Sequence, residues 1–124
     1  FVPGENLLPF NYKNNKLGFA ICYETSIPEH SKKIYDQGAN VYIASVLNSI
    51  NSVDNDIRRI SAIAEKYQMT SLMSNFVGTS GGSRCAGKTS IWNNQGKLLE
   101  QLDPVNEGTA IIDLNTQETT KIKL

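Results

Sequence analysis

Cys22 is the strongest candidate for a reactive residue in the chain, because a cysteine placed where a strand is followed by a helix can act as a nucleophile. The apolar residues 17–21 precede it and are typical of a strand buried on both faces. Ser26 and Glu29, with Pro28 between them, predict a helix that begins four residues after the cysteine. A side chain at such a turn lies at the carboxyl end of the sheet, where open α/β folds bind ligands. The helix N-terminus would favour a thiolate, and its free N–H groups would hold a developing oxyanion.

Several alternatives stay open for these candidates. Most free cysteines are small buried hydrophobes, and Cys22 fits that description as well. His30 is the only histidine and would be the natural partner of a cysteine–histidine dyad. Its place in the first turn of the predicted helix favours an exposed surface histidine instead. Asn75 ends a predicted strand, where it either orients a polar substrate or bonds its own backbone as a turn residue.

The segment from Gly82 to Thr89 fits the phosphate-binding pattern G-x-x-x-x-G-K-S/T letter for letter. That mechanism needs a helix that opens at the lysine and threonine, so that its amides cradle the phosphates. Here Lys88 and Thr89 are followed by only three residues before a turn at residues 93–96, which leaves no room for a helix. The pattern therefore indicates a strand-connecting loop, and a nucleotide-binding module remains the alternative from another functional class.

The elements around these residues predict an α/β fold. Residues 17–21 and 41–46 are typical of buried strands, and a helix that ends near Gly38 joins them, which is the pattern of a parallel crossover. Residues 57–67 carry apolar side chains at helical spacing and predict an amphipathic helix that covers the sheet. Short strands, a loop and a turn are expected later in the chain: strands over 72–77, 89–92, 97–102 and 109–114, the loop over 78–87 and the turn over 93–96.

Composition and charge limit the functional classes. The chain has 124 residues, 40% of them apolar, which suits one folded domain. Twelve basic residues balance twelve acidic ones, so nothing points to nucleic acid or an anionic membrane as a partner. No apolar run approaches the ~20 residues needed to cross a bilayer. Cys22 and Cys85 match neither a disulfide framework nor a zinc pattern, so we expect a cytoplasmic protein with no metal and no cofactor.

Several segments together resemble the nitrilase, or carbon–nitrogen hydrolase, superfamily. They are Phe1-x-Pro3-Gly4, residues 18–24, Pro28-Glu29, residues 38–40, Asn75-x-Val77-Gly78, residues 87–89, Trp92, Gly96 and Glu107-Gly108. The cysteine segment with the proline–glutamate pair after it is the specific part, and the order and spacing of the others agree with it. The resemblance also explains the phosphate-loop pattern, since amidase-like members often carry Gly-Lys-Ser/Thr at that point.

The resemblance implies half of a four-layer αββα sandwich, with a mixed sheet and helices on one face. It implies that Cys22 attacks an amide or nitrile carbon to form a thioester, with the amide favoured by Tyr23-Glu24 and the amidase-like loop, and that the Tyr23 backbone N–H completes the oxyanion site. Glu24 and Asn75 are the candidates for binding the substrate. An acyltransferase branch with the same Cys-Tyr-Glu segment and a non-catalytic relative of the fold remain alternatives. The implied partners are a small amide or nitrile and further copies of the chain.

In the family, the glutamate base and a lysine lie upstream of the phenylalanine–proline–glycine segment with which this chain begins. Glu5 falls after the usual acidic positions, and Lys13 and Lys16 lie at a predicted turn, where water would surround them. We therefore expect residues 1–124 to be the C-terminal portion of one hydrolase domain, inactive without the N-terminal portion. Loss of a general base or of an oxyanion-stabilising charge lowers a rate by on the order of 10²–10⁴-fold.

Overall fold

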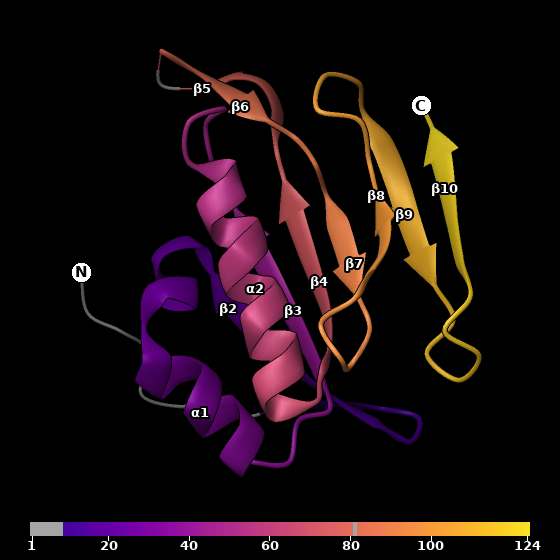
Figure 1. The fold of residues 1–124 in the computed structure, drawn as a ribbon. Coiled ribbons are helices and arrows are strands. Elements are labelled where there is room, and N and C mark those ends of the chain that lie inside the picture. Colours follow the sequence, from indigo (N-terminus) through magenta and orange to yellow (C-terminus); the bar gives the residue numbers. More distant parts are fainter. Residues whose placement is uncertain (1–8, 81) are drawn as a thin grey trace.

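A six-stranded mixed sheet organises the computed structural model, which describes residues 9–80 and 82–124 (Figure 1). Phe1, Pro3, Gly4 and Glu5, all named above, lie outside the described residues. In chain order the elements are β1 (Phe10–Tyr12), β2 (Asn15–Ile21), the 3₁₀-helix η1 (Cys22–Ser26), α1 (Pro28–Asp36), β3 (Val41–Val46), α2 (Val53–Tyr67), β4 (Thr70–Asn75), β5 (Val77–Ser80), β6 (Ser83–Ala86), β7 (Ser90–Trp92), β8 (Leu98–Gln101), β9 (Gly108–Ile112) and β10 (Thr119–Lys123).

The centre of the sheet is parallel, as the crossover pattern predicted. The strand order is β1-β2-β3-β4-β7-β8, and β2, β3 and β4 pair in parallel through α1 and α2. The outer strands β1, β7 and β8 pair antiparallel, and β5–β6 and β9–β10 form separate hairpins. Because β2, β3 and β4 run the same way, their carboxyl ends meet at one edge of the sheet. Cys22 follows β2 at that edge.

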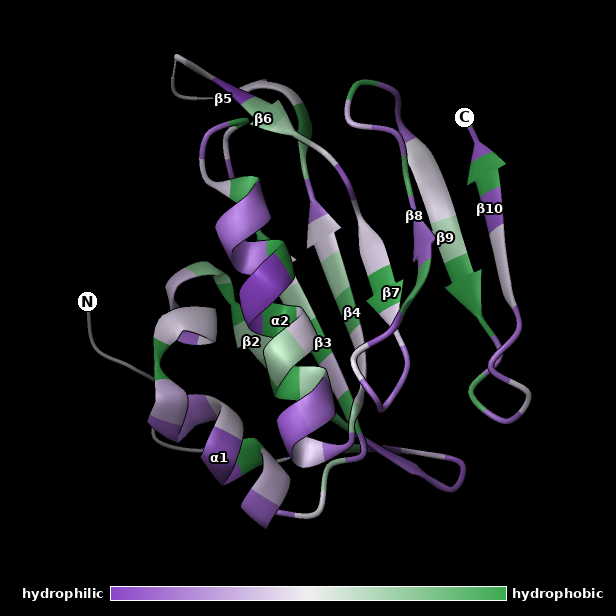
Figure 2. Ribbon diagram, viewed as in Figure 1, coloured by the Kyte–Doolittle hydropathy of each residue, from purple (hydrophilic) through white to green (hydrophobic). Residues whose placement is uncertain are grey.

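Both helices cover the same face of the sheet, and the core lies between them and the strands (Figure 1). Tyr42 and Met73 point from the central strands toward Ile60 of α2, and all three are fully buried. Figure 2 shows hydrophobic stretches along β4, β7 and β9 and hydrophilic residues over much of α1 and α2. On the opposite face of the sheet, Phe19 and Ile21 of β2 are 48% and 65% exposed. The sheet therefore has one covered face and one open face.

Two parts of the chain differ from the sequence-based expectation. Residues 78–87 were expected to form a loop, but β5 and β6 pair there as a hairpin, with Ser80 opposite Ser83. Gly82 has a φ of 80°, which the tight turn of such a hairpin favours. The strand β10 was not predicted, because its alternation is weak and most of its residues are exposed. Across the described residues, no helix is both long and apolar enough to cross a membrane.

Candidate active site

Cys22 lies at the carboxyl end of β2, where the chain enters η1, and its side chain is exposed. Its φ of 43° is in the left-handed region, which costs a residue other than glycine on the order of 1–3 kcal/mol. A strained strand-to-helix turn is also how α/β-hydrolases present a nucleophile above a sheet. The structure therefore places Cys22 where the sequence predicted, and within this chain the residue is exposed rather than part of the core.

Three side chains of η1 bond to the backbone of this turn. The N–H of Ile21 donates to Glu24 Oε1 over 2.9 Å, and Thr25 Oγ1 donates to the Cys22 carbonyl over 2.9 Å. Ser26 Oγ donates to the Tyr23 carbonyl over 2.6 Å. Each such hydrogen bond contributes about 0.5–1.5 kcal/mol, so the three together offset the strain at Cys22.

The helix that follows starts differently from the prediction. Ser26 does not cap α1: Ile27 is the N-cap residue, Pro28 is the first helical residue, and no side chain caps the helix. Cys22 is the first residue of the short helix η1, so it does not lie directly before α1 as the sequence predicted. Tyr23 lies in the first turn of η1, where backbone N–H groups have no acceptor within the helix. The oxyanion role of Tyr23 stays a prediction that this geometry permits.

Cys22 lines a cavity of about 280 Å³ formed by η1, the loop after β3 and the first turns of α2. Asn48 comes from the loop, and Asp56 and Arg59 come from α2, where they form an ion pair. Burial raises the pKa of the Asp56 carboxyl, and the Arg59 guanidinium opposes that shift. Sequence reasoning missed these three residues. Asn48 follows a predicted strand and could have been found by the same edge rule as Cys22, whereas the α2 pair depends on packing.

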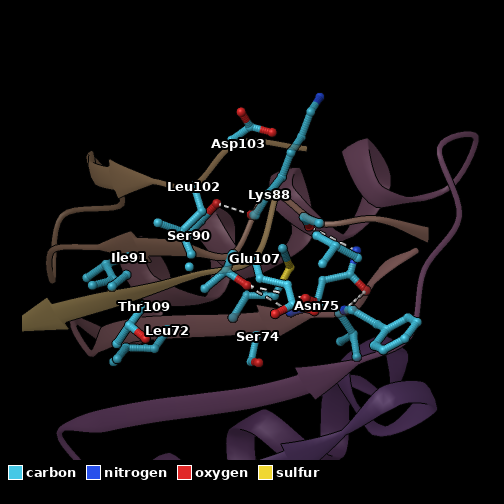
Figure 3. Close-up of a pocket in the computed structure, with 18 of the residues that line it drawn as sticks. Leu72, Ser74, Asn75, Lys88, Ser90, Ile91, Leu102, Asp103, Glu107 and Thr109 are labelled. Atoms are coloured by element: carbon cyan, nitrogen blue, oxygen red, sulfur yellow. Dashed lines mark hydrogen bonds between the residues drawn. The ribbon is translucent and has the colours of Figure 1, made fainter. Parts of the chain in front are cut away.

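A larger cavity of about 650 Å³ lies on the open face of the sheet, beside β9 (Figure 3). Its polar lining includes Lys88, Ser90, Glu107 and Thr109, and it contains no cysteine. Its hydroxyl groups, such as those of Ser90 and Thr109, would need an activating base, and no histidine lines this cavity among the described residues. The smaller cavity is therefore the candidate active site, because it contains the sulfur.

Asn75 lines the larger cavity, so the structure does not bring it into the cavity of Cys22. Its Nδ2 donates to the carbonyls of Gly87 and Asn48 over 2.9 and 3.2 Å. Its Oδ1 accepts from the N–H groups of Asn48 and Phe76, each over 2.9 Å. The side chain thus joins two loops rather than only its own turn. Its substrate-binding role stays a prediction, while its contact with Asn48 links it to the wall of the smaller cavity.

His30 was expected on the surface, and that expectation is wrong. The residue is 7% exposed, and its Nε2 lies 3.3 Å from Glu24 Oε2. Since Glu24 Oε1 already accepts from Ile21, both carboxylate oxygens of Glu24 are engaged within the protein. Glu24 lies beneath the turn and is not among the residues that line the cavity of Cys22.

The phosphate-loop pattern forms no phosphate loop. The strand β7 begins at Ser90, directly after Lys88 and Thr89, so no helix offers its amides to a ligand. Lys88 Nζ lies 3.2 Å from Asp54 Oδ1, which ties the lysine to the start of α2. The absence of a phosphate loop agrees with the prediction, but the expected strand-connecting loop is confined to residues 87–89, because Ser83–Ala86 form β6. Within residues 9–80 and 82–124, no cluster of three or more histidine, cysteine or acidic side chains could hold a metal ion.

The two cysteines provide a direct test of this geometry. At neutral pH, iodoacetamide is expected to modify Cys22 at least about tenfold faster than Cys85, because only an accessible thiolate reacts. Cys85 is 4% exposed and serves as the internal control. Peptide mass spectrometry over a time course measures both rates. Equally slow labelling of the two would contradict the placement of Cys22.

Comparisons with known proteins agree with this geometry. Residues 2–124 match the carbon-nitrogen hydrolase family. An apolipoprotein N-acyltransferase from Prochlorococcus marinus is 28% identical over 116 residues, which cover 94% of this chain and 22% of that protein. A carbon-nitrogen hydrolase from Helicobacter pylori superposes with a TM-score of 0.78 at 16% identity, over 99% of this chain and 45% of that one.

A third similar protein is an amidase from Nesterenkonia sp. AN1, in a mutant with the acetamide moiety of fluoroacetamide added covalently at its active-site cysteine. It has a TM-score of 0.72 at 21% identity, over 100% of this chain and 43% of that one. Identities this low show a shared fold. The chain spans less than half the length of each of these three proteins.

Proposed function

The chain belongs to the carbon–nitrogen hydrolase family, and from that premise we propose that it supplies the nucleophile for hydrolysis of an amide C–N bond. One observation carries the proposal: an exposed cysteine at a strained turn, lining a cavity at the carboxyl edge of a parallel sheet. Cys22 would be the nucleophile, and the Tyr23 N–H would donate to the oxyanion.

The reaction has two halves on one sulfur. The Cys22 sulfur attacks the amide carbon, the C–N bond breaks, and the amine leaves with a proton, so a thioester remains. Water then adds to the thioester carbonyl, the C–S bond breaks, and the acid leaves as the thiol is restored. The proton transfers need a general base, which the family resemblance assigns to a glutamate upstream of this segment. The activity is therefore proposed for the full-length protein.

The other predicted site residues fit supporting roles in this proposal. Glu24 holds the N–H of Ile21 and faces His30, which supports a role in shaping the turn rather than in contacting substrate. Asn75 holds both polar backbone groups of Asn48, which supports a role in fixing the cavity wall.

An acyltransferase is the second candidate, and the 28% identity to an apolipoprotein N-acyltransferase favours it. The two activities share the attack on a carbonyl and the thioester at Cys22. They differ in what attacks the thioester: water in the hydrolase, and an amine in the acyltransferase. The experiment must therefore separate formation of the thioester from its fate.

We expect the full-length protein to release ammonia from small primary amides and to carry a transient acyl adduct on Cys22. Ammonia is measured by a coupled assay, and the adduct by intact mass spectrometry after an acid quench, with Cys85→Ala as the control that must retain the adduct. Continued release of ammonia only when an amine acceptor is added would favour the acyltransferase. No adduct and no release across amide, nitrile and ester substrates would favour a non-catalytic subunit and overturn the proposal.

A further inference from the structure

His30 is a buried polar side chain beneath the Cys22 turn to which the proposed reaction assigns no task. It comes from the first turn of α1 and is 7% exposed. Its Nε2 lies 3.3 Å from Glu24 Oε2, and neither ring nitrogen has an aligned hydrogen-bond partner among the described residues. Burying a polar ring in this way is unfavourable unless something compensates for the lost water. The contact with Glu24 is the compensation that the geometry offers.

Glu24 connects His30 to the backbone that carries the nucleophile. Its Oε1 accepts the N–H of Ile21 over 2.9 Å, while its Oε2 faces the imidazole. Ile21 directly precedes Cys22, whose φ of 43° must be held by its surroundings. A carboxylate anchored at one oxygen alone can rotate about its side-chain bonds, whereas contacts at both oxygens fix its plane. His30 therefore restrains the Glu24 carboxylate, which in turn holds the backbone next to Cys22.

The surroundings leave Glu24 as the negative partner of His30. Burial raises the pKa of the Tyr42 hydroxyl of β3 strongly, so it stays neutral. On α2, Asp56 and Arg59 pair with each other. On β2, the residues that face the helices are a glycine and an alanine, neither of which is charged. The charged neighbours of His30 on its own helix are exposed: Glu29, Lys32 and Lys33.

We propose that His30 is a positioning residue for the Cys22 turn and that it acts through Glu24, an inference that rests on the proposed role of Cys22 as nucleophile. His30 is not among the residues that line the cavity of Cys22, so it does not act on the substrate directly. Without its contact, the carboxylate of Glu24 would hold the Ile21 N–H in more than one geometry. A displacement of reacting atoms by about 1 Å can lower a rate by on the order of 100-fold.

The test uses His30→Leu in the full-length protein. We expect kcat to fall by about tenfold or more while KM stays nearly unchanged, because the reacting sulfur moves and the binding surface does not. Alkylation of Cys22 by iodoacetamide should slow in parallel. His30→Gln, whose amide can still donate to Glu24, should recover most of both rates. Ser31→Ala is the matched control, since Ser31 is equally buried on α1 but donates only to the Pro28 carbonyl, 3.2 Å away.

Each outcome decides the inference. Wild-type kcat and alkylation rates in His30→Leu would overturn it, and so would equal losses in His30→Leu and His30→Gln. A matching loss in Ser31→Ala would assign the effect to helix stability and also overturn it. If His30→Leu does not fold, His30→Asn replaces it, because its shorter amide cannot reach Glu24. Wild-type kcat in the Cys22→Ala variant would contradict the proposed function itself. An inactive Cys22→Ala variant together with wild-type kcat in the His30→Leu variant would contradict only the positioning role of His30.

Discussion

Replacing Cys22 with alanine is expected to lower kcat/KM for an amide substrate by at least on the order of 10³-fold in the full-length protein. The sulfur is the group that forms the acyl bond, and no other cysteine lines this cavity among the described residues. The side chain is exposed, so its removal leaves the core intact. Steady-state kinetics measures the loss, and thermal unfolding shows whether the fold is retained.

A second substitution at the same position separates chemistry from stability. Cys22→Gly should be as inactive as Cys22→Ala but at least as stable, because glycine adopts a φ of 43° without steric strain. Cys85→Ala is the matched control for the loss of a thiol and should retain turnover. Residual turnover above a few per cent in both Cys22 variants would show that another group is the nucleophile.

Gly18→Val is expected to destabilise the protein by about 1–3 kcal/mol or more, through overpacking between β2 and α1. A Cβ on Gly18 would lie 2.2 Å from Ile34 Cγ2 and 3.4 Å from Ala39 Cβ, so α1 would have to move away from the strand. The Cys22 turn connects these two elements, and activity should therefore fall with stability. Urea unfolding of the full-length protein measures the free energy of unfolding.

Two further substitutions near Gly18 serve as a control and as a compensating change. Phe19→Val alters the adjacent residue on the open face of β2 and should change stability far less, because Phe19 is half exposed. Ile34→Ala in the Gly18→Val background removes the clashing methyl groups and should restore part of the loss. If Gly18→Val and Phe19→Val were equally destabilising, close packing of β2 on α1 would not be the cause.

The parallel centre of the fold could be predicted because its signals are local. Residues 17–21 and 41–46 are short apolar runs, and the helix over residues 57–67 has a clear apolar stripe. The structure contains a strand or a helix at each of these places. By contrast, β10 depends on pairing with β9 and has a weak pattern of its own. The hairpin of β5 and β6 was not predicted, because its segment is rich in glycine and serine, which are common in loops.

The position of Cys22 was predictable for the same reason, since a buried strand followed by a helix start marks the edge of a sheet. The environment of His30 was not predictable. Its place in the first turn of α1 is compatible with a surface or a buried side chain, and its contact with Glu24 of η1 belongs to the tertiary structure. Likewise, the sequence gives no sign that Asp56 and Arg59 line the same cavity as Cys22, because folding brings together residues that are more than thirty positions apart.

The order in which the strands pair affects when the Cys22 turn forms during folding. Hairpins such as β9–β10 close short loops, which takes on the order of microseconds. On one side β2 pairs with β1 across a short turn, but on the other its partner is β3, and Leu17 aligns with Val41 only after the whole of α1 has crossed over. Pairings between distant parts of a chain form slowly, because the entropy of closing the loop is lost first. We therefore expect the turn around Cys22 to be among the last parts to reach its native geometry during refolding. Catalytic activity should then return later than the compact state of the chain.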